Sequence, residues 1–274
     1  MEMIYTLITL LVLIFFYLFL IAPRPKRADA LKPFSHVDFA HRGLHNNHKG
    51  IPENSIPAFK KAISMGYGIE LDVQLTKDHK VVVFHDDTLS RVCGIDLLVR
   101  DKTYDELMEL SLFHTKEKIP LLSEVLTLVK GCVPLLIEIK LPIRSTKTCE
   151  LLNEVLKDYQ GHYCIESFNT LAIGWYRKNR PDIVRGQLSS KLTKSISEAG
   201  FFLNFIVENL LSNFLGRPDF ISYCYTDTAK LSYWLNKHLF SAMTMAWTIT
   251  SPDIYASTLT KFDSFIFEGF HTRA

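Results

Sequence analysis

Hydrophobic residues are unevenly distributed along the chain, and the longest apolar run lies at the N-terminus. Residues 3–22 read MIYTLITLLVLIFFYLFLIA and carry no charged side chain. A run of this length is about what a helix needs to cross a hydrocarbon core of ~30 Å. A signal peptide would have a basic start and a small-x-small cleavage site, and both are missing here. We therefore predict a transmembrane helix over 3–22; a cleaved signal sequence and a buried core helix are the alternatives.

Basic residues follow this run directly, at Arg24, Lys26, Arg27 and Lys32. Because positive charge accumulates on the cytoplasmic side of membrane helices, this asymmetry predicts a single-pass membrane protein whose following domain is cytoplasmic. Residues 23–35 are basic and contain prolines, so we predict a juxtamembrane linker there and one folded domain over 36–274. The five cysteines form no CxxC pair, which fits a reducing compartment better than a disulfide framework.

Beyond residue 36, short apolar runs alternate with amphipathic helical patterns. Between most of these runs, apolar side chains recur at helical spacing, as at Ile56, Phe59, Ala62 and Ile63. This alternation predicts a parallel sheet covered by helices. Nine runs have the length and composition of strands: 37–40, 69–73, 81–84, 134–139, 163–167, 183–188, 220–223, 243–248 and 264–267.

The second and third runs differ from the others, because residues 74–80 are too few to hold a helical crossover between them. We interpret this pair as a hairpin, and counting it once leaves the eight strands of a (β/α)8 TIM barrel. Residues 87–118 are predicted to form a small insertion. The predicted fold class is therefore α/β; a doubly wound open sheet is the alternative, although the chain has no glycine-rich nucleotide motif.

The overall composition narrows the possible functions. The 274 residues include 31 Lys and Arg against 29 Asp and Glu, a formal net charge of +2. This near-neutral balance excludes a nucleic-acid binder that relies on bulk positive charge. The charged fraction of 22% and the 19 phenylalanines exclude wholesale disorder. The length suits one anchor and one barrel, and the composition does not indicate an oligomeric state.

Polar side chains occur near the ends of the predicted strands, where barrel enzymes carry their catalytic residues. Glu70 and Asp72 are two residues apart, so they share one face of a strand. Glu138 lies near the end of another strand. Three converging carboxylates form a hard oxygen site that suits Mg²⁺ or Ca²⁺. Ion pairing, of Glu138 with Lys140 or of Glu70 with Arg42, is the alternative.

Two histidines, His41 and His85, follow other predicted strands. A pair of imidazoles that titrate near neutrality can act as general base and general acid. Arg42 and Lys140 add fixed positive charge, which suits a phosphate group. The combination indicates phosphoryl chemistry, because positive charge stabilises the extra negative charge of the transition state. We interpret His45 and the remaining histidines as surface or packing residues.

An ordered set of motifs resembles the glycerophosphodiester phosphodiesterase family. The resemblance spans residues 36–268, and the ordered set is far more specific than any one of its members. Its first part is Phe39-Ala40-His41-Arg42-Gly43, Pro52-Glu53-Asn54-Ser55, Glu70-Leu71-Asp72-Val73 and Val81–Asp86. Its later part includes Ile137-Glu138-Ile139-Lys140, Ser167-Phe168 and Ala246-Trp247-Thr248.

The resemblance implies a TIM barrel of the phospholipase C-like phosphodiesterase type with a small insertion. It also implies a divalent cation, Mg²⁺ or Ca²⁺, at Glu70, Asp72 and Glu138. By the same similarity, His41 and His85 are expected to be the acid–base pair. Members of the family hydrolyse glycerophosphodiesters to an alcohol and sn-glycerol 3-phosphate, and we expect this metal-dependent reaction here.

The resemblance further implies that Arg42 and Lys140 contact the substrate phosphate. Trp247 is expected to line the glycerol pocket, with a core tryptophan as the alternative. Two other functions stay open. One is lysophospholipase D-like action on membrane lysolipids, for which the anchor would hold the barrel mouth near the bilayer. The other is a non-catalytic barrel scaffold.

Several positions leave open questions. Phe267-Glu268-Gly269 stands where the family typically has Thr-Asp, and Thr250 stands in place of an asparagine. The usual closing helix after the last strand is missing, so we expect that strand to expose apolar surface. Glu53 and Asn54 either begin a helix or hold His41 or the metal site.

Overall fold

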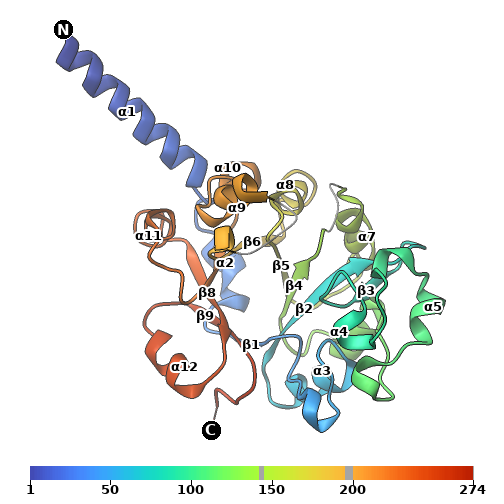
Figure 1. Ribbon diagram of the computed structural model, residues 1–274. Coiled ribbons are helices and arrows are strands. Elements are labelled where there is room, and N and C mark those ends of the chain that lie inside the picture. Colours follow the sequence, from blue (N-terminus) through green and yellow to red (C-terminus); the bar gives the residue numbers. More distant parts are fainter. Residues whose placement is uncertain (142–144, 195–199, 274) are drawn as a thin grey trace.

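Eight parallel strands form a closed barrel in the computed structural model, which describes residues 1–141, 145–194 and 200–273 (Figure 1). The strand order is β1-β9-β8-β7-β6-β5-β4-β2, and a further pairing of β1 with β2 closes the ring. The predicted (β/α)8 barrel is therefore confirmed. Its strands are β1 (Asp38–Ala40), β2 (Gly68–Leu75), β4 (Leu135–Ile139), β5 (Tyr163–Ser167), β6 (Val184–Ser189), β7 (Phe220–Cys224), β8 (Met243–Ile249) and β9 (Ser264–Phe267).

Helices cover the outside of the barrel between successive strands. The larger ones are α3 (Ile56–Ser64), α6 (Leu122–Val129), α7 (Lys147–Val155), α8 (Thr170–Asn179), α9 (Gly200–Glu208), α11 (Leu231–His238) and α12 (Pro252–Thr258). Short helices are η2 (Asn47–Lys49), η5 (Leu192–Lys194) and α10 (Asn213–Gly216). Alternation along the strands decides which side chains meet these helices: Leu71 and Ile137 pack outward in the main hydrophobic core.

The predicted hairpin is also confirmed. Strand β3 (Val81–Val83) pairs antiparallel with β2, with Val83 opposite Val73. The predicted insertion follows it as α4 (Ser90–Cys93), η3 (Val99–Asp101), α5 (Tyr104–Met108) and η4 (Leu112–His114). These helices share a small apolar core of their own with Val82 and Phe84. The insertion is thereby a compact unit beside the second and third strands.

The predicted juxtamembrane linker folds against the barrel. It forms α2 (Ala28–Leu31) and η1 (Lys32–Phe34). Leu31 and Phe34 are buried in one cluster with the barrel-interior side chains Phe39, Leu136, Cys164, Val184, Phe220, Met243, Met245 and Ile266. We call this cluster the barrel floor. Arg27 Nε and Nη2 donate to Asp219 at 2.9 and 2.8 Å. These bonds fix the segment beside the residue that precedes β7.

The N-terminal apolar segment forms α1 (Glu2–Ile21), which projects from the barrel (Figure 1). It is long and apolar enough to cross a membrane, and only 6% of its most apolar stretch is buried. Its last turn docks on the barrel. Asn213 and Asn236 donate to the Ile21 carbonyl at 2.9 and 3.1 Å, and Arg217 donates to the carbonyls of Phe19 and Ala22 at 3.0 and 2.7 Å. These bonds satisfy carbonyls that a helix end leaves without partners.

The expectation of exposed apolar surface along β9 is wrong. All four residues of this strand are buried. The half-buried Phe270 ring packs on Phe267 and Tyr255 at centroid distances of 5.6 and 6.1 Å. Further along, Thr272 Oγ1 donates to Asp38 at 2.6 Å, so the extended segment after β9 covers the neighbouring barrel wall.

Because Phe34 fills the barrel floor, Phe34→Ala should lower the free energy of unfolding by about 3–5 kcal/mol, the usual cost of such a cavity. Denaturant unfolding of the full chain in detergent micelles measures this loss. Lys32→Ala, an exposed change in the same short helix, is the control and should stay within about 0.5 kcal/mol of the wild type. Equal stability of the Phe34 and Lys32 variants would contradict the role of the floor.

Candidate active site

His41 and Arg42 are positioned by a tight turn that directly follows β1. Arg42 and Gly43 have φ values of 53° and 77°, in the left-handed region that glycine tolerates best. A Cβ at Gly43 would lie 2.9 Å from the Phe59 ring and 3.0 Å from Ala58, so the turn also requires glycine for close packing on α3. The turn brings the backbone N–H of Arg42 to Glu70 Oε2 at 2.8 Å.

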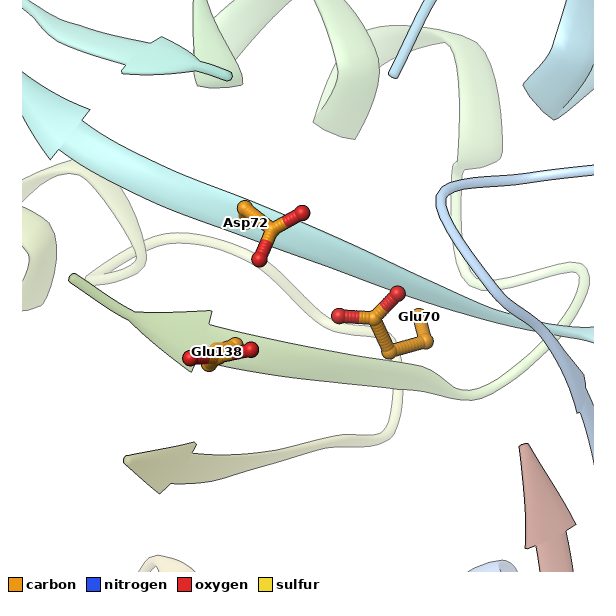
Figure 2. A group of neighbouring side chains, drawn as sticks. All are labelled: Glu70, Asp72 and Glu138. Atoms are coloured by element: carbon orange, nitrogen blue, oxygen red, sulfur yellow. The ribbon is translucent and has the colours of Figure 1, made fainter. Parts of the chain in front are cut away.

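Glu70, Asp72 and Glu138 come together at the mouth of the barrel (Figure 2). All three are buried, and each offers an oxygen within 4.8 Å of the others. Parallel pairing sets Asp72 beside Glu138 in the register of β2 and β4. Because Leu71 points outward, Glu70 and Asp72 both point inward. The predicted convergence of these carboxylates is thus observed.

Burial and mutual repulsion act strongly on this acidic cluster. Burial, together with the charges of Asp72 and Glu138, raises the pKa of Glu70 well above its usual range. Burial and Asp72 also raise the pKa of Glu138, against the opposing effect of Lys140. Burial would raise the pKa of Asp72 too, but Lys140, His85 and Arg42 together lower it below its usual value. The cluster therefore retains a tendency to hold a proton.

Ion pairs occur within the same cluster. The expected pair of Glu138 with Lys140 is present, whereas the Arg42 side chain pairs with Asp72 and Glu53. Lys140 Nζ lies 2.6 Å from Glu138 Oε1 and 3.1 Å from Asp72 Oδ1. Arg42 Nε lies 3.5 Å from Asp72 Oδ2. The two cations predicted to contact phosphate thus lie beside the carboxylates, where they offset part of the charge.

His41 is held by a carboxylate that the sequence interpretation did not assign. Its Nδ1 lies 2.6 Å from Glu268 Oε2, and because a carboxylate only accepts, Nδ1 carries the proton and Nε2 is left as the basic nitrogen. Burial lowers the pKa of His41, against the raising effect of Glu268. His45 Nε2 lies 3.6 Å from the same oxygen of Glu268, so His45 belongs to the surroundings of the site.

His85 has an equivalent partner in the next residue. Its Nδ1 lies 2.5 Å from Asp86 Oδ1. Arg91 from α4 donates to both oxygens of Asp86, at 2.7 and 2.9 Å. The same guanidinium donates to both oxygens of Glu53 at 2.8 and 2.7 Å. Arg91 is therefore the residue through which the insertion supports the site.

The alternatives for Glu53 and Asn54 are decided by their contacts. Asn54 Nδ2 donates to Asp72 Oδ2 at 2.9 Å, so Asn54 holds a member of the acidic cluster. Glu53 accepts from Arg42 Nη1 at 2.7 Å. Burial would raise the pKa of Glu53, but Arg91 and Arg42 lower it to about 2. Ser55, the next residue, begins α3 by accepting from the Ala58 N–H.

Glu166 is a fourth buried carboxylate that the sequence interpretation missed. It lies next to Glu138 in the register of β5 and β4 and is 1% exposed. Burial and the Glu138 charge raise its pKa well above the usual range. The signal was available, because Glu166 falls on the same alternating face as Cys164, whose side chain is part of the barrel floor.

Trp247 lies near the end of β8 and packs edge-on against Phe168 at a centroid distance of 5.6 Å. Phe168 directly follows β5. Both rings are only partly buried. Trp247 also packs against the barrel floor, and both rings lie near the carboxyl ends of their strands, where a barrel enzyme binds its substrate.

The residues present fit a divalent cation. Three buried carboxylates supply hard oxygen ligands, the type that Mg²⁺ and Ca²⁺ prefer. Asp72 Oδ1 is buried, and its contact with Lys140 Nζ at 3.1 Å is an ion pair rather than a well-aligned hydrogen bond. Burial first, and then the charges of Asp72 and Glu138, raise the pKa of Glu70, so a cation beside Glu70 would stabilise its ionised form. The charge and the donor atoms both favour a bound cation over a purely ion-paired cluster.

Comparison with known proteins places these residues in context. A curated glycerophosphodiester phosphodiesterase from Bacillus altitudinis is 38% identical over 158 residues, which cover 53% of this chain and 63% of the relative. A Thermotoga maritima glycerophosphodiester phosphodiesterase structure is 29% identical, with a TM-score of 0.63 over 85% of this chain and 94% of that one. An Oleispira antarctica phosphodiesterase, solved with sn-glycerol-3-phosphate, shares the fold at 23% identity, with a TM-score of 0.70 over 87% of this chain and 94% of that one.

The alignment with the Bacillus altitudinis relative covers less than two thirds of that protein. The profile of the glycerophosphoryl diester phosphodiesterase family matches residues 41–198. The match begins at His41 and ends beyond β6. This match spans more than half of the chain and contains every residue of the acidic cluster. The chain therefore belongs to the glycerophosphoryl diester phosphodiesterase family.

Proposed function

We propose that this chain is a membrane-anchored enzyme that hydrolyses glycerophosphodiesters to an alcohol and sn-glycerol 3-phosphate. The observation that carries the proposal is the pairing of each histidine with its own carboxylate beside a buried acidic cluster. The names of the curated relatives and the sn-glycerol-3-phosphate bound to the Oleispira antarctica protein agree with this substrate class.

Glu70, Asp72 and Glu138 would hold the cation, Mg²⁺ or Ca²⁺. When bound, it would offset negative charge on the phosphate. Lys140 and Arg42 lie against the same carboxylates, so they can add positive charge to the phosphate from the edge of the cluster. Trp247 and Phe168 would exclude water from one side of the glycerol group.

The first chemical step uses the two histidines in opposite protonation states. His41 is assigned as the base, because burial lowers its pKa and so favours the neutral imidazole, which can accept a proton. Its Nε2 takes the proton of the glycerol 2-hydroxyl while that oxygen forms a bond to phosphorus. The bond from phosphorus to the alcohol breaks, and His85, protonated and held by Asp86, donates a proton to the leaving oxygen.

The second step reverses these roles. The products of the first step are the free alcohol and a cyclic glycerol phosphate. His85, now neutral, takes a proton from water while the water oxygen bonds to phosphorus. The bond to the glycerol 2-oxygen breaks, and His41 returns its proton to that oxygen. Both histidines regain their starting states. Direct attack of water on the diester is the competing route.

The docking of α1 bears on the choice between soluble and membrane substrates. Asn213 and Asn236 hold the end of α1 at the N-terminal side of the barrel, whereas the acidic cluster lies toward the carboxyl ends of the strands. Strands of five or six residues span about 17–20 Å, so the mouth lies away from the bilayer. This arrangement supports water-soluble glycerophosphodiesters over lysolipids held in the same membrane.

The same contacts support retention of α1 as a single-pass anchor. The last residue of a cleaved signal sequence would not pack against the mature domain. Ile21, however, is fully buried, and its carbonyl accepts two hydrogen bonds from the barrel. The basic residues that follow α1 support a cytoplasmic barrel. Five free cysteines in the described structure are consistent with that compartment.

His41→Ala should lower kcat/KM by about 10²–10⁴-fold, because general base catalysis typically contributes that much. EDTA should abolish the release of glycerol 3-phosphate, and Mg²⁺ or Ca²⁺ should restore it. A coupled assay with a water-soluble glycerophosphodiester measures both. His48→Ala is a control outside the histidine pair and should keep wild-type activity. Activity that survives both treatments would eliminate the proposed mechanism.

Glu268→Gln should lower kcat/KM by on the order of tenfold or more, because His41 loses the carboxylate that stabilises its protonated form. Since Glu268 raises the pKa of His41, its removal should move the acidic limb of the pH–rate profile to lower pH. Glu268→Asp should restore part of the rate. A loss of rate without movement of the acidic limb would show that Glu268 acts only through packing.

Cation affinity should fall as the pH is lowered. The pKa of Glu70 is raised, so at low pH this group holds a proton that a bound cation must displace. One displaced proton changes the apparent affinity by about tenfold per pH unit below the pKa. Calorimetric titration with Mg²⁺ or Ca²⁺, in buffers of different ionisation enthalpy, counts the released protons. An affinity independent of pH would refute this linkage, and no binding at any pH would favour a non-catalytic scaffold.

A further inference from the structure

A basic cleft lies at the N-terminal face of the barrel, beside the end of α1 and across the barrel from the acidic cluster. Its volume is about 520 Å³. Four arginines from four separate segments converge on it. The lining residues are Pro23, Arg24, Pro25, Arg177, Pro181, Arg185 and Arg217.

Positive charge in this cleft exceeds the negative charge near it. None of its described lining residues is acidic. The neighbouring carboxylate of Asp219 already accepts two hydrogen bonds from Arg27, at 2.9 and 2.8 Å. Arg24 and Arg185 come only within 4.0 and 3.8 Å of it. One carboxylate therefore faces several guanidinium groups.

Arg185 shows the imbalance most clearly. It is 2% exposed, and its Nε donates to the Gly216 carbonyl at 2.8 Å. Its Nη1 is buried and has no hydrogen-bond partner among the residues that the structure describes. Burial, together with the charges of Arg24 and Arg27, lowers its pKa to about 10, against the effect of Asp219. A buried guanidinium in this state is stabilised when an anion lies nearby.

Backbone carbonyls hold the other arginines in place. Arg24 Nη1 donates to Pro181 at 2.7 Å, and Arg177 Nη1 donates to Phe214 at 2.5 Å. Arg217 uses Nη1 for the two carbonyls at the end of α1. A guanidinium has five N–H donors, and these contacts use one nitrogen of each side chain. The cleft is thus a positioned set of donors of the kind that binds phosphate oxygens.

The position of the cleft indicates where such a phosphate would come from. Arg217 contacts both the cleft and the last turn of α1, so the cleft lies where a transmembrane α1 leaves the bilayer. Trp234 on α11 and Leu215 on α10 are 54% and 46% exposed, on the two helices that hold the end of α1. Exposed tryptophan and leucine side chains are typical of surfaces that meet the membrane interface.

We propose that this cleft binds the phosphate of an anionic lipid head group. Basic pockets on the cytoplasmic side of membrane helices bind lipid head groups by the same contacts. The proposal is independent of the catalytic reaction, and it rests on the proposed anchor only for the source of the phosphate. A lipid bound here would fix the barrel on the membrane surface and stabilise the junction between α1 and the barrel.

Thermal unfolding of the full chain in uncharged detergent tests the proposal. The probes are a short-chain phosphatidic acid, a phosphatidylcholine of equal chain length and inorganic phosphate. Phosphatidic acid at about ten times its Kd should raise Tm by about 3–6 °C, and phosphatidylcholine should not. Inorganic phosphate should give a smaller rise of its own, and phosphatidic acid added on top of it should raise Tm by less than it does alone.

Two double variants distinguish a built site from diffuse attraction. Arg24→Gln with Arg177→Gln should abolish the rise in Tm. Lys26→Gln with Lys178→Gln removes the same charge at neighbouring positions outside the cleft lining, and should retain it. Should the first variant fail to fold, Arg177→Gln alone, an exposed change, should weaken the affinity by about tenfold or more, the usual effect of losing a charged hydrogen bond.

Four results would overturn the proposal. The wild-type Tm could be unchanged by phosphatidic acid, or both double variants could lose the response equally, as diffuse attraction predicts. The response could survive in the Arg24/Arg177 variant, which would place the ligand elsewhere, including the active site. A response to inorganic phosphate with none to phosphatidic acid would show a site for free phosphate and exclude the lipid.

Discussion

The mutual repulsion of three buried carboxylates is the constraint around which the barrel mouth is built. Glu70, Asp72 and Glu138 lie too close together for all of them to be ionised without compensation. The turn after β1 has positive φ values at Arg42 and Gly43, and this conformation brings the Arg42 N–H to Glu70. Asn54 and Lys140 have matching roles toward Asp72. Compensation then extends outward, from Arg42 to Glu53 and from His85 to Asp86.

This outward extension joins the insertion to the barrel. Glu53 links Arg42 to Arg91, and Arg91 links Glu53 to the partner of His85. A change in the insertion can therefore reach the acid–base pair through charged hydrogen bonds, without any change in the barrel strands. The barrel floor is a cluster of apolar side chains and shares no residue with this network. Stability and chemistry are thus divided between the two ends of one barrel, as is general for this fold.

Sequence patterns predicted the barrel well because each strand is a short apolar run followed by a helical repeat. They also predicted the acidic cluster, because strand alternation alone sets Glu70 and Asp72 on one face. The partnership of His41 with Glu268 was missed, since 227 residues separate the two and no local pattern reports on such a contact. Residues 23–35 were predicted as a linker from their prolines and charges, whereas Leu31 and Phe34 find apolar partners only in the closed barrel.

The contacts of that segment also set an order of events during synthesis. Arg27 is separated from Asp219 by 192 residues, and Phe34 packs against Met243 and Ile266 in the floor. Helix α1 is synthesised long before its docking partners, since 192 and 215 residues separate Ile21 from Asn213 and Asn236. Contacts of such long range form late. Ring closure and docking of α1 therefore complete together, after a long interval in which the apolar floor of the nascent chain is still open to chaperones.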